Sequence, residues 1–236
     1  EAFGKDVINP SQLLLERMPK TIQNAQIDTL LLPVAGAQAL TLIEKQVLAV
    51  SYDVVLCLGQ AGGRDALSVE RVAINLDDYP IADNAGSQSI DEMIMADGEP
   101  AYFSDLPIKA MVHRCREAGV PAIVSNTAGT YVCNHVMYGC AYLKRKHHLH
   151  YRNGFVHVPY LPSQSDHLPS MELGMMEQGI CAMLTAIVSN RKKGKETGMK
   201  AIRAVIIVIF LAAVGIYGLA EYQEMANADP NRPQLV

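Results

Sequence analysis

The chain carries no excess of positive charge, because 24 acidic residues face 20 basic ones and the formal net charge is −4. Proteins that bind nucleic acids use a clustered basic surface, so this balance argues against a nucleic-acid partner. Tryptophan is absent and only four phenylalanines are present, which restricts the function little. Half of the residues are hydrophobic. The 236 residues can therefore bury a sizeable core, and the chain is predicted to be ordered.

No C-x-x-C pair occurs among the cysteines, which argues against a zinc site or a disulfide-exchange motif. No signal peptide is visible at the start, so free thiols in a cytoplasmic, reducing compartment are expected. The run KRKHHLH at 144–150 lacks a carboxylate or cysteine at ligand spacing and is interpreted as a solvated helix end. We therefore predict no metal and no other cofactor. The five cysteines are Cys57, Cys115, Cys133, Cys140 and Cys181.

Strand-like and helix-like segments alternate along the first 190 residues. Strands are expected at 27–34, 53–58, 67–75, 121–125 and 155–159, and helices at 11–18, 38–50, 108–118, 130–146 and 170–189. Residues 77–100 are rich in Asp, Gly and Asn and are expected to be irregular. This alternation predicts an α/β fold, a three-layer α/β/α arrangement around a mainly parallel, twisted sheet.

Cys133 is a candidate nucleophile because it lies where an expected strand and a glycine-containing turn lead into a helix. The first turn of a helix has free N–H groups and partial positive charge, which lower the pKa of a thiol and can stabilise an oxyanion. The alternative is an inert cysteine buried under the helix.

Two further polar residues stand out within apolar strands. His157 lies in GFVHVPY and Glu70 in LSVERVA. Taken singly, His157 could be a core histidine bonded to a carbonyl, and Glu70 could form an ion pair with Arg71 or Arg64. Together with Cys133 they supply a nucleophile, a base and a group that orients the base, the set that thiol catalysis needs.

Several sequence blocks in a fixed order resemble the pyroglutamyl peptidases, a family of cysteine peptidases with an α/β/α fold. The resemblance covers residues 3–189. Its most specific blocks are GQAGGR at 59–64, SVERVAIN at 68–75, AYFSDLPIKAMV at 101–112, SNTAGTYVCNHVMY at 125–138 and GFVHVPYLP at 154–162.

The resemblance implies that the chain removes N-terminal pyroglutamate from peptides by acyl transfer, without a cofactor. It implies Cys133 as nucleophile, His157 as base and Glu70 as the orienting acid. It also assigns Phe3, Gln60, Tyr131 and Val132 to the pocket for the pyroglutamyl ring. Family members associate, so a homo-oligomer is expected.

Two departures from the family pattern motivate a second hypothesis. The family begins with a strand, VLVTGFxPFGG, of which the part before Glu1 and one pocket Phe are missing. Pro80 stands where the family has an Arg that assists the site. Our alternative is accordingly a catalytically impaired relative that acts by binding, tethered to a membrane.

The C-terminal region departs from the family pattern as well. We expect a peptidase-like domain at 1–190, a basic linker at 191–203, an apolar segment at 204–220 and an acidic tail at 221–236. The apolar segment carries no charge and could anchor the chain in a membrane, with the domain on the cytoplasmic side. It could instead be an interface helix, or residues 205–210 could form a strand in place of the missing one.

Overall fold

The computed structural model describes residues 8–190 and 202–209. The α-helices are α1 (Pro10–Arg17), α2 (Gly36–Ala49), α3 (Ile108–Glu117), α4 (Val132–Lys146) and α5 (Leu173–Ser189), with a 3-10 turn η1 (Pro162–Gln164). The strands are β1 (Thr21–Ile22), β2 (Ala25–Leu32), β3 (Val54–Gln60), β4 (Leu67–Glu70), β5 (Val72–Ile74), β6 (Ala101–Phe103), β7 (Ala122–Ser125), β8 (Arg152–Val158) and β9 (Ile202–Ile209).

A seven-stranded sheet in the order β1-β2-β9-β3-β8-β4-β7 forms the middle layer. Strands β2, β9, β3 and β8 run parallel to one another, and β4 pairs in parallel with β7. The β1–β2 and β4–β8 pairs are antiparallel. The predicted mainly parallel sheet is confirmed. The antiparallel pairing of β8 with β4 was not predicted.

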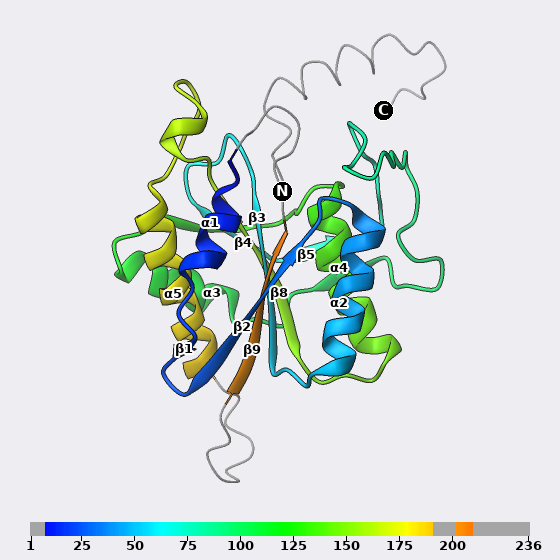
Figure 1. Ribbon diagram of the computed structural model, residues 1–236, viewed down its shortest axis with the longest axis horizontal. Coiled ribbons are helices and arrows are strands. Elements are labelled where there is room, and N and C mark those ends of the chain that lie inside the picture. Colours follow the sequence, from blue (N-terminus) through cyan, green and yellow to red (C-terminus); the bar gives the residue numbers. More distant parts are fainter. Residues whose placement is uncertain (1–7, 191–201, 210–236) are drawn as a thin grey trace.

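Helices cover both faces of this sheet (Figure 1): α1, α3 and α5 lie on one side and α2 and α4 on the other. Side chains alternate across β3, since Val54, Leu56 and Leu58 join the core under α1, α3 and α5. Val55 and Cys57 join the core under α2 and α4. The three-layer α/β/α arrangement expected from the sequence is therefore confirmed.

Helix α1 begins one residue earlier than expected, and its N-cap is Asn9. The Asn9 side-chain oxygen accepts from the backbone N–H of Ser11 (3.0 Å) and from its hydroxyl (2.7 Å). Pro10 then occupies the first helical turn, where the missing N–H costs nothing.

The single strand expected over 67–75 is two strands in different sheets. At Arg71 the backbone N–H still reaches the neighbouring strand β7, donating to Ser125 O (2.9 Å). The Arg71 carbonyl instead accepts from the N–H of Ser104 (2.9 Å), just after β6. Past this residue, β5 pairs with β6 in a separate two-stranded sheet.

Residues 77–100, expected to be irregular, contain no helix or named strand.

Strand β9 lies in the centre of the sheet, in register with β2 (Ala25↔Ile202) and with β3 (Val54↔Ala204). Of the alternatives for the apolar C-terminal segment, the structure therefore has a strand over 202–209. Residues 210–220 lie outside the described residues. Across the ranges 8–190 and 202–209, no helix is long and apolar enough to cross a membrane.

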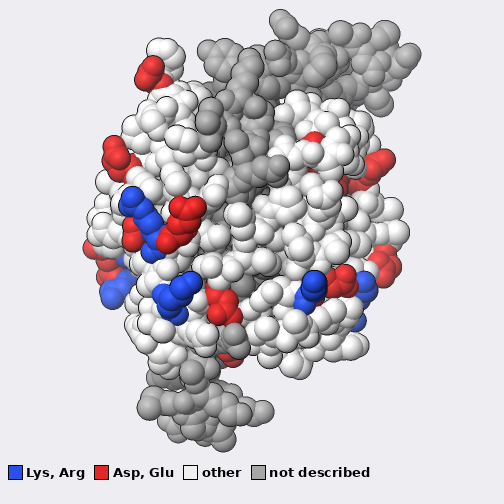
Figure 2. All heavy atoms as spheres, viewed as in Figure 1, with Lys and Arg blue, Asp and Glu red and all other residues white. Residues whose placement is uncertain are grey.

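Charged side chains of both signs are interspersed on the face shown in Figure 2, where red and blue groups lie side by side around an uncharged middle. At the end of α4, Lys146 Nζ and His147 Nε2 both contact Glu44 Oε1, at 3.1 and 2.6 Å. Lys144 contacts Asp105 in the same way. The basic run at 144–150 thus engages carboxylates of neighbouring segments.

Candidate active site

Strand alternation directs His157 and Glu70 to the face of the sheet under α4, the helix that carries Cys133. In β8, Phe155 joins the core on that face while Val156 and Val158 join the other, so His157 shares the side of Phe155. In β4, Leu67 and Val69 belong to the opposite core, which leaves Glu70 on the side of α4. Cys133 is the second residue of α4 and part of its core.

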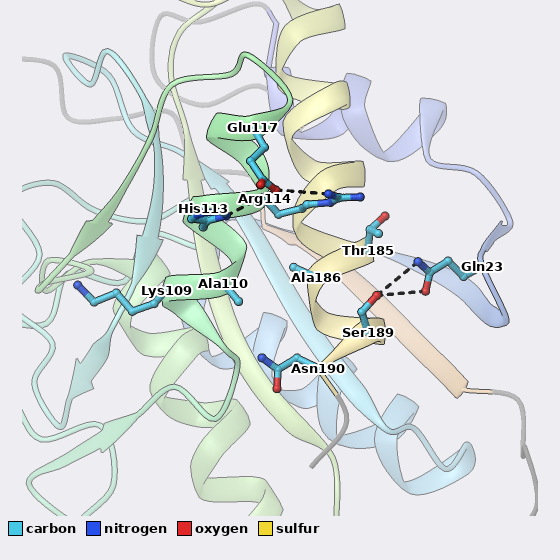
Figure 3. Close-up of a pocket in the computed structure, with 10 residues that line it drawn as sticks. All are labelled: Gln23, Lys109, Ala110, His113, Arg114, Glu117, Thr185, Ala186, Ser189 and Asn190. Carbon is cyan, nitrogen blue, oxygen red and sulfur yellow. Dashed lines mark hydrogen bonds and ion pairs between the residues drawn. The ribbon is translucent and has the colours of Figure 1, made fainter. Parts of the chain in front are cut away.

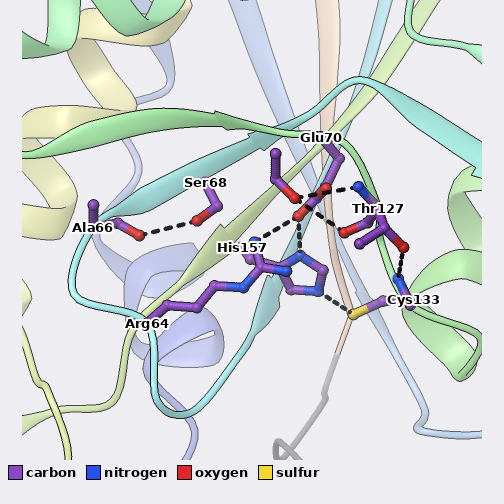
Figure 4. A network of polar contacts seen from close by, with 9 residues as sticks. Arg64, Ala66, Ser68, Glu70, Thr127, Cys133 and His157 are labelled. Carbon is purple, nitrogen blue, oxygen red and sulfur yellow. Dashed lines mark hydrogen bonds and ion pairs between the residues drawn. The ribbon is translucent and has the colours of Figure 1, made fainter.

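These three side chains form a continuous chain of contacts (Figure 4). The Cys133 sulfur lies 2.9 Å from His157 Nε2, and His157 Nδ1 lies 2.7 Å from Glu70 Oε1. An ionised carboxylate can only accept, so the Nδ1–H of His157 donates to Glu70 and Nε2 faces the thiol with its lone pair. The structure thus brings together the thiol, the imidazole and the carboxylate that the sequence singled out.

Burial controls how these groups ionise, because all three are nearly inaccessible, with Cys133 4%, His157 3% and Glu70 0% exposed. It raises the pKa of Cys133 well above its usual value, and the charge of Glu70 adds to this effect. It lowers the pKa of His157, against the opposing hydrogen bond and charge of Glu70. Both shifts favour the neutral thiol and the neutral imidazole, which for the thiol is opposite to the effect that the helix position alone predicts.

The carboxylate of Glu70 has a second partner. Arg64 Nη1 lies 2.8 Å from the same Oε1 that contacts His157. Burial alone would raise the pKa of Glu70, but the hydrogen bond from His157 and the charges of His157 and Arg64 outweigh it and lower that pKa. The two interpretations of Glu70, an ion pair with Arg64 and a partner of His157, therefore hold at the same time.

The start of α4 offers backbone donors beside the thiol. The N-cap residue, Tyr131, makes no side-chain capping bond to the described helix, and its hydroxyl instead donates to Ala82 O (3.2 Å). Its ring meets Tyr79 edge-on at 4.7 Å between centroids. Pro80 follows Tyr79 directly, so the position that departs from the family pattern lies close to this helix end.

The four residues assigned to the substrate pocket have different positions. Tyr131 is half-buried and Val132 is fully buried in the core beneath α4, both directly before Cys133. Gln60 ends β3 and is 2% exposed. Phe3 lies outside the described residues.

Sequence reasoning missed Gln164, which holds Gln60 in place. The side-chain amide of Gln164 donates to Gln60 Oε1 (2.9 Å) and to the carbonyl of Ile8 (3.1 Å). Its own carbonyl accepts from the N–H of Leu161 (2.9 Å). Gln164 belongs to a one-turn 3-10 helix in a loop, where no periodicity in the sequence distinguishes it.

A second hollow lies on the opposite face of the sheet, between α3 and α5 (Figure 3). It has a volume of about 940 Å³, and His113 and Arg114 point into it from α3, where both contact Glu117. These ion pairs are exposed, and no thiol lines the hollow. Its lining residues are Gln23, Lys109, Ala110, His113, Arg114, Glu117, Thr185, Ala186, Ser189 and Asn190.

An α/β/α fold in which an imidazole contacts both a buried thiol and a buried carboxylate is an arrangement that cysteine peptidases use. A family model described as pyroglutamyl peptidase matches residues 1–190. The chain belongs to this family.

Relatives of known sequence and structure agree with this assignment. The chain is 46% identical over 201 residues to the pyrrolidone-carboxylate peptidase of Clostridium perfringens, covering 84% of this chain and 94% of the relative. It is 44% identical over 191 residues to that of Thermosipho africanus, covering 80% and 93%.

Among solved structures, the pyroglutamyl peptidase I of Bacillus amyloliquefaciens aligns with a TM-score of 0.77 at 38% identity, covering 84% of this chain and 95% of that one. The pyrrolidone carboxyl peptidase of Thermococcus litoralis aligns with a TM-score of 0.78 at 31% identity, covering 84% and 96%. The comparisons confirm the predicted family and enzyme class, and they give no support to the alternative of an impaired, membrane-tethered relative.

Proposed function

We propose that the chain releases N-terminal pyroglutamate from peptides, with Cys133 as nucleophile, His157 as general base and acid, and Glu70 as the group that orients His157. The observation that carries the proposal is the unbroken line of contacts, 2.9 Å from Cys133 Sγ to His157 Nε2 and 2.7 Å from His157 Nδ1 to Glu70 Oε1. Each link has the length of a hydrogen bond that transfers or fixes a proton.

The reaction proceeds by acyl transfer. As Cys133 Sγ attacks the pyroglutamyl carbonyl carbon, its proton passes to His157 Nε2 and the carbonyl oxygen becomes an oxyanion. Backbone N–H groups at the start of α4 stabilise that oxyanion. The C–N bond then breaks, and His157 gives its proton to the leaving amine. A water molecule, deprotonated by His157, hydrolyses the thioester and restores the thiol.

Recognition must rest on the lactam ring, because pyroglutamate has no free α-amine. A small pocket with one or two amide-type partners suits such a ring. Gln60 supplies an amide beside the site, and its contact with Gln164 (2.9 Å) fixes its position. Tyr131, which is half-buried, supplies apolar surface near Cys133, and the fully buried Val132 lies between the two in sequence. Self-association, which the family resemblance implies, stays a prediction of this function.

Turnover of a pyroglutamyl amide of 7-amino-4-methylcoumarin tests the proposal. The Cys133→Ser variant replaces the thiol by a hydroxyl that His157 cannot activate in the same way, so we expect kcat/KM to fall by at least about a thousandfold. Cys181→Ser is the matched control, because Cys181 is a half-buried thiol on the other side of the sheet. It should retain wild-type activity.

Two outcomes would contradict the proposal. One is a folded wild-type protein that does not release the coumarin. The other is a Cys133→Ser variant that keeps the activity of the control, which would remove Cys133 from the reaction.

A further inference from the structure

The loop that follows β3 carries Arg64, to which neither the family resemblance nor the reaction above assigns a role. Three features hold this loop against the sheet. The N–H of Ala61 donates to Val158 O (2.9 Å), and Gly62 lies so close to the Tyr160 ring that a Cβ would meet it at 2.4 Å. Gly63 has φ +79°, a left-handed conformation that glycine adopts without strain. The backbone thus turns and presents the next side chain, Arg64, to the sheet.

Arg64 contacts Glu70, the fully buried last member of the series Cys133, His157 and Glu70. Its guanidinium lies 2.8 Å from Glu70 Oε1, and its side chain is 27% exposed whereas that of Glu70 is fully buried. Figure 4 shows the guanidinium and the imidazole of His157 approaching the same carboxylate. One oxygen therefore accepts from two donors on different segments, which fixes the direction in which the carboxylate faces His157.

We propose that Arg64 is a positioning residue of the reaction: it holds the Glu70 carboxylate in the orientation that His157 needs and balances its buried negative charge. The proposal rests on the function proposed above. A carboxylate alone beside the thiol would disfavour the negative charge that develops on sulfur during attack, and Arg64 offsets this effect without touching the substrate.

The role of Arg64 can be measured, because its charge shifts the pKa values of the other site residues in a known direction. The titratable side chains of Tyr131 and Cys57 also interact with the thiol, and Cys133 contributes to the raised pKa of each. Among the described residues, the groups whose charges shift the pKa values of the site are Arg64 from the loop, Glu70 from β4, His157 from β8 and Cys133 itself from α4. Arg64 lowers the pKa of each of the other three. Without its charge, His157 would hold a proton at higher pH and be unable to act as a base there.

The pH dependence of kcat/KM tests the role of Arg64, because this parameter reports the ionisation of the free enzyme. In Arg64→Gln we expect the acid limb to move to higher pH and kcat/KM near neutral pH to fall by about tenfold or more, the factor that loss of one charge-assisted hydrogen bond carries. Arg64→Lys keeps the charge, so its acid limb should lie close to the pH at which the wild-type limb lies.

The matched control is Arg71→Gln. Arg71 follows Glu70 in the sequence, but its side chain donates to Asn126 Oδ1 (2.8 Å) instead of to the carboxylate. Its acid limb should coincide with that of the wild type. An unshifted limb in Arg64→Gln, or an equal shift in Arg71→Gln, would overturn the proposal.

A second readout separates this proposal from the proposed function. The rate at which iodoacetamide alkylates Cys133, followed by mass spectrometry against pH, reports the thiol without any peptide turnover. The pH at which the alkylation rate is half-maximal should rise in Arg64→Gln and not in Arg71→Gln. A shift here together with activity that survives Cys133→Ser would mean that the proposed function fails while the role of Arg64 on the thiol stands. An unchanged alkylation profile and an unshifted acid limb, in a protein that Cys133→Ser inactivates, would mean that the proposed function stands while the role of Arg64 fails.

Discussion

Gly59 lies where β3 passes beneath the start of α4, and its position limits how closely the sheet and the thiol can approach. A Cβ at this position would meet the Cys133 sulfur at 2.9 Å and the Phe155 ring at 2.7 Å. Both neighbours are buried, so neither can move aside cheaply. The absence of a side chain at this residue is thus what allows the thiol to sit against the strand that pairs with β8.

We therefore predict that Gly59→Ala displaces the Cys133 sulfur from His157 and lowers kcat/KM by about a hundredfold, since a shift on the order of 1 Å has that effect on aligned groups. Overpacking should also lower the free energy of unfolding by about 1–3 kcal/mol. Gly174→Ala is the control, because a Cβ there meets nothing within 4 Å. Equal activity of the two variants, measured with the coumarin substrate, would contradict the prediction.

At the scale of elements, β9 provides the backbone partner for two strands at once. It pairs with β2 over Ala25↔Ile202 to Leu32↔Ile209 and with β3 over Val54↔Ala204 to Leu58↔Val208. Without it, the edges of β2 and β3 would face each other with unpaired N–H and C=O groups, and buried groups of this kind cost free energy. β3 carries Gly59 and pairs with the strand that carries His157, so the site depends on this pairing.

Proline at position 206 should break this ladder, because it removes an N–H from the middle of a central strand. Ile206 pairs with both Thr29 and Leu56. We expect Ile206→Pro to lower the melting temperature by about 5 °C or more. Ile206→Val, which keeps the backbone N–H and a β-branched side chain, should stay within about 2 °C of the wild type. Differential scanning calorimetry measures both, and a melting temperature unchanged by proline would exclude β9 from the sheet.

Elements with a strong local pattern were predictable from the sequence, and those defined by distant pairing were not. The five α-helices lie close to their expected ranges because amphipathic spacing and stop signals such as Gly119 are local. The break at Arg71 arises from a change of partner strand, from β7 to β6, which leaves the apolar pattern of 67–75 unchanged. The antiparallel β8–β4 pair is likewise a property of the packed sheet.

The same distinction applies to the site. Cys133, His157 and Glu70 were predictable because each is a polar group in an apolar strand or at a helix start. Arg64 entered only as one of two candidate ion-pair partners for Glu70, because sequence spacing does not tell which arginine a loop directs inward. Gln164 gave no signal, since a glutamine among polar loop residues is not unusual.

At the scale of the whole molecule, the buried site couples the stability of the fold to pH. Burial favours the neutral form of His157 and places its pKa in the folded protein below the ordinary value of 6.5. The unfolded chain then binds the extra proton first as pH falls, so the stability that His157 contributes is complete above about pH 6.5 and decreases below it. The lowered pKa of Glu70 acts in the same direction, but in a lower pH window, below the ordinary glutamate value of 4.5.

We expect the melting temperature to decrease between about pH 7.5 and about pH 5.5, and His157→Gln to flatten this decrease because glutamine does not titrate. His113→Gln is the control, because the side chain of His113 is 75% exposed. Thermal unfolding followed by circular dichroism gives the slope of each variant. A His157→Gln protein with the wild-type slope would show that another group dominates the coupling.

The place of β9 also has a consequence for how the protein is made. Strands β2 and β3 leave the ribosome well before β9, the strand that lies between them in the sheet. Until then the nascent chain exposes two hydrophobic strand edges, the state in which proteins pair wrongly with one another. Translation speed and chaperone supply should accordingly decide the yield of active enzyme more than they do for a sheet whose central strand is synthesised first.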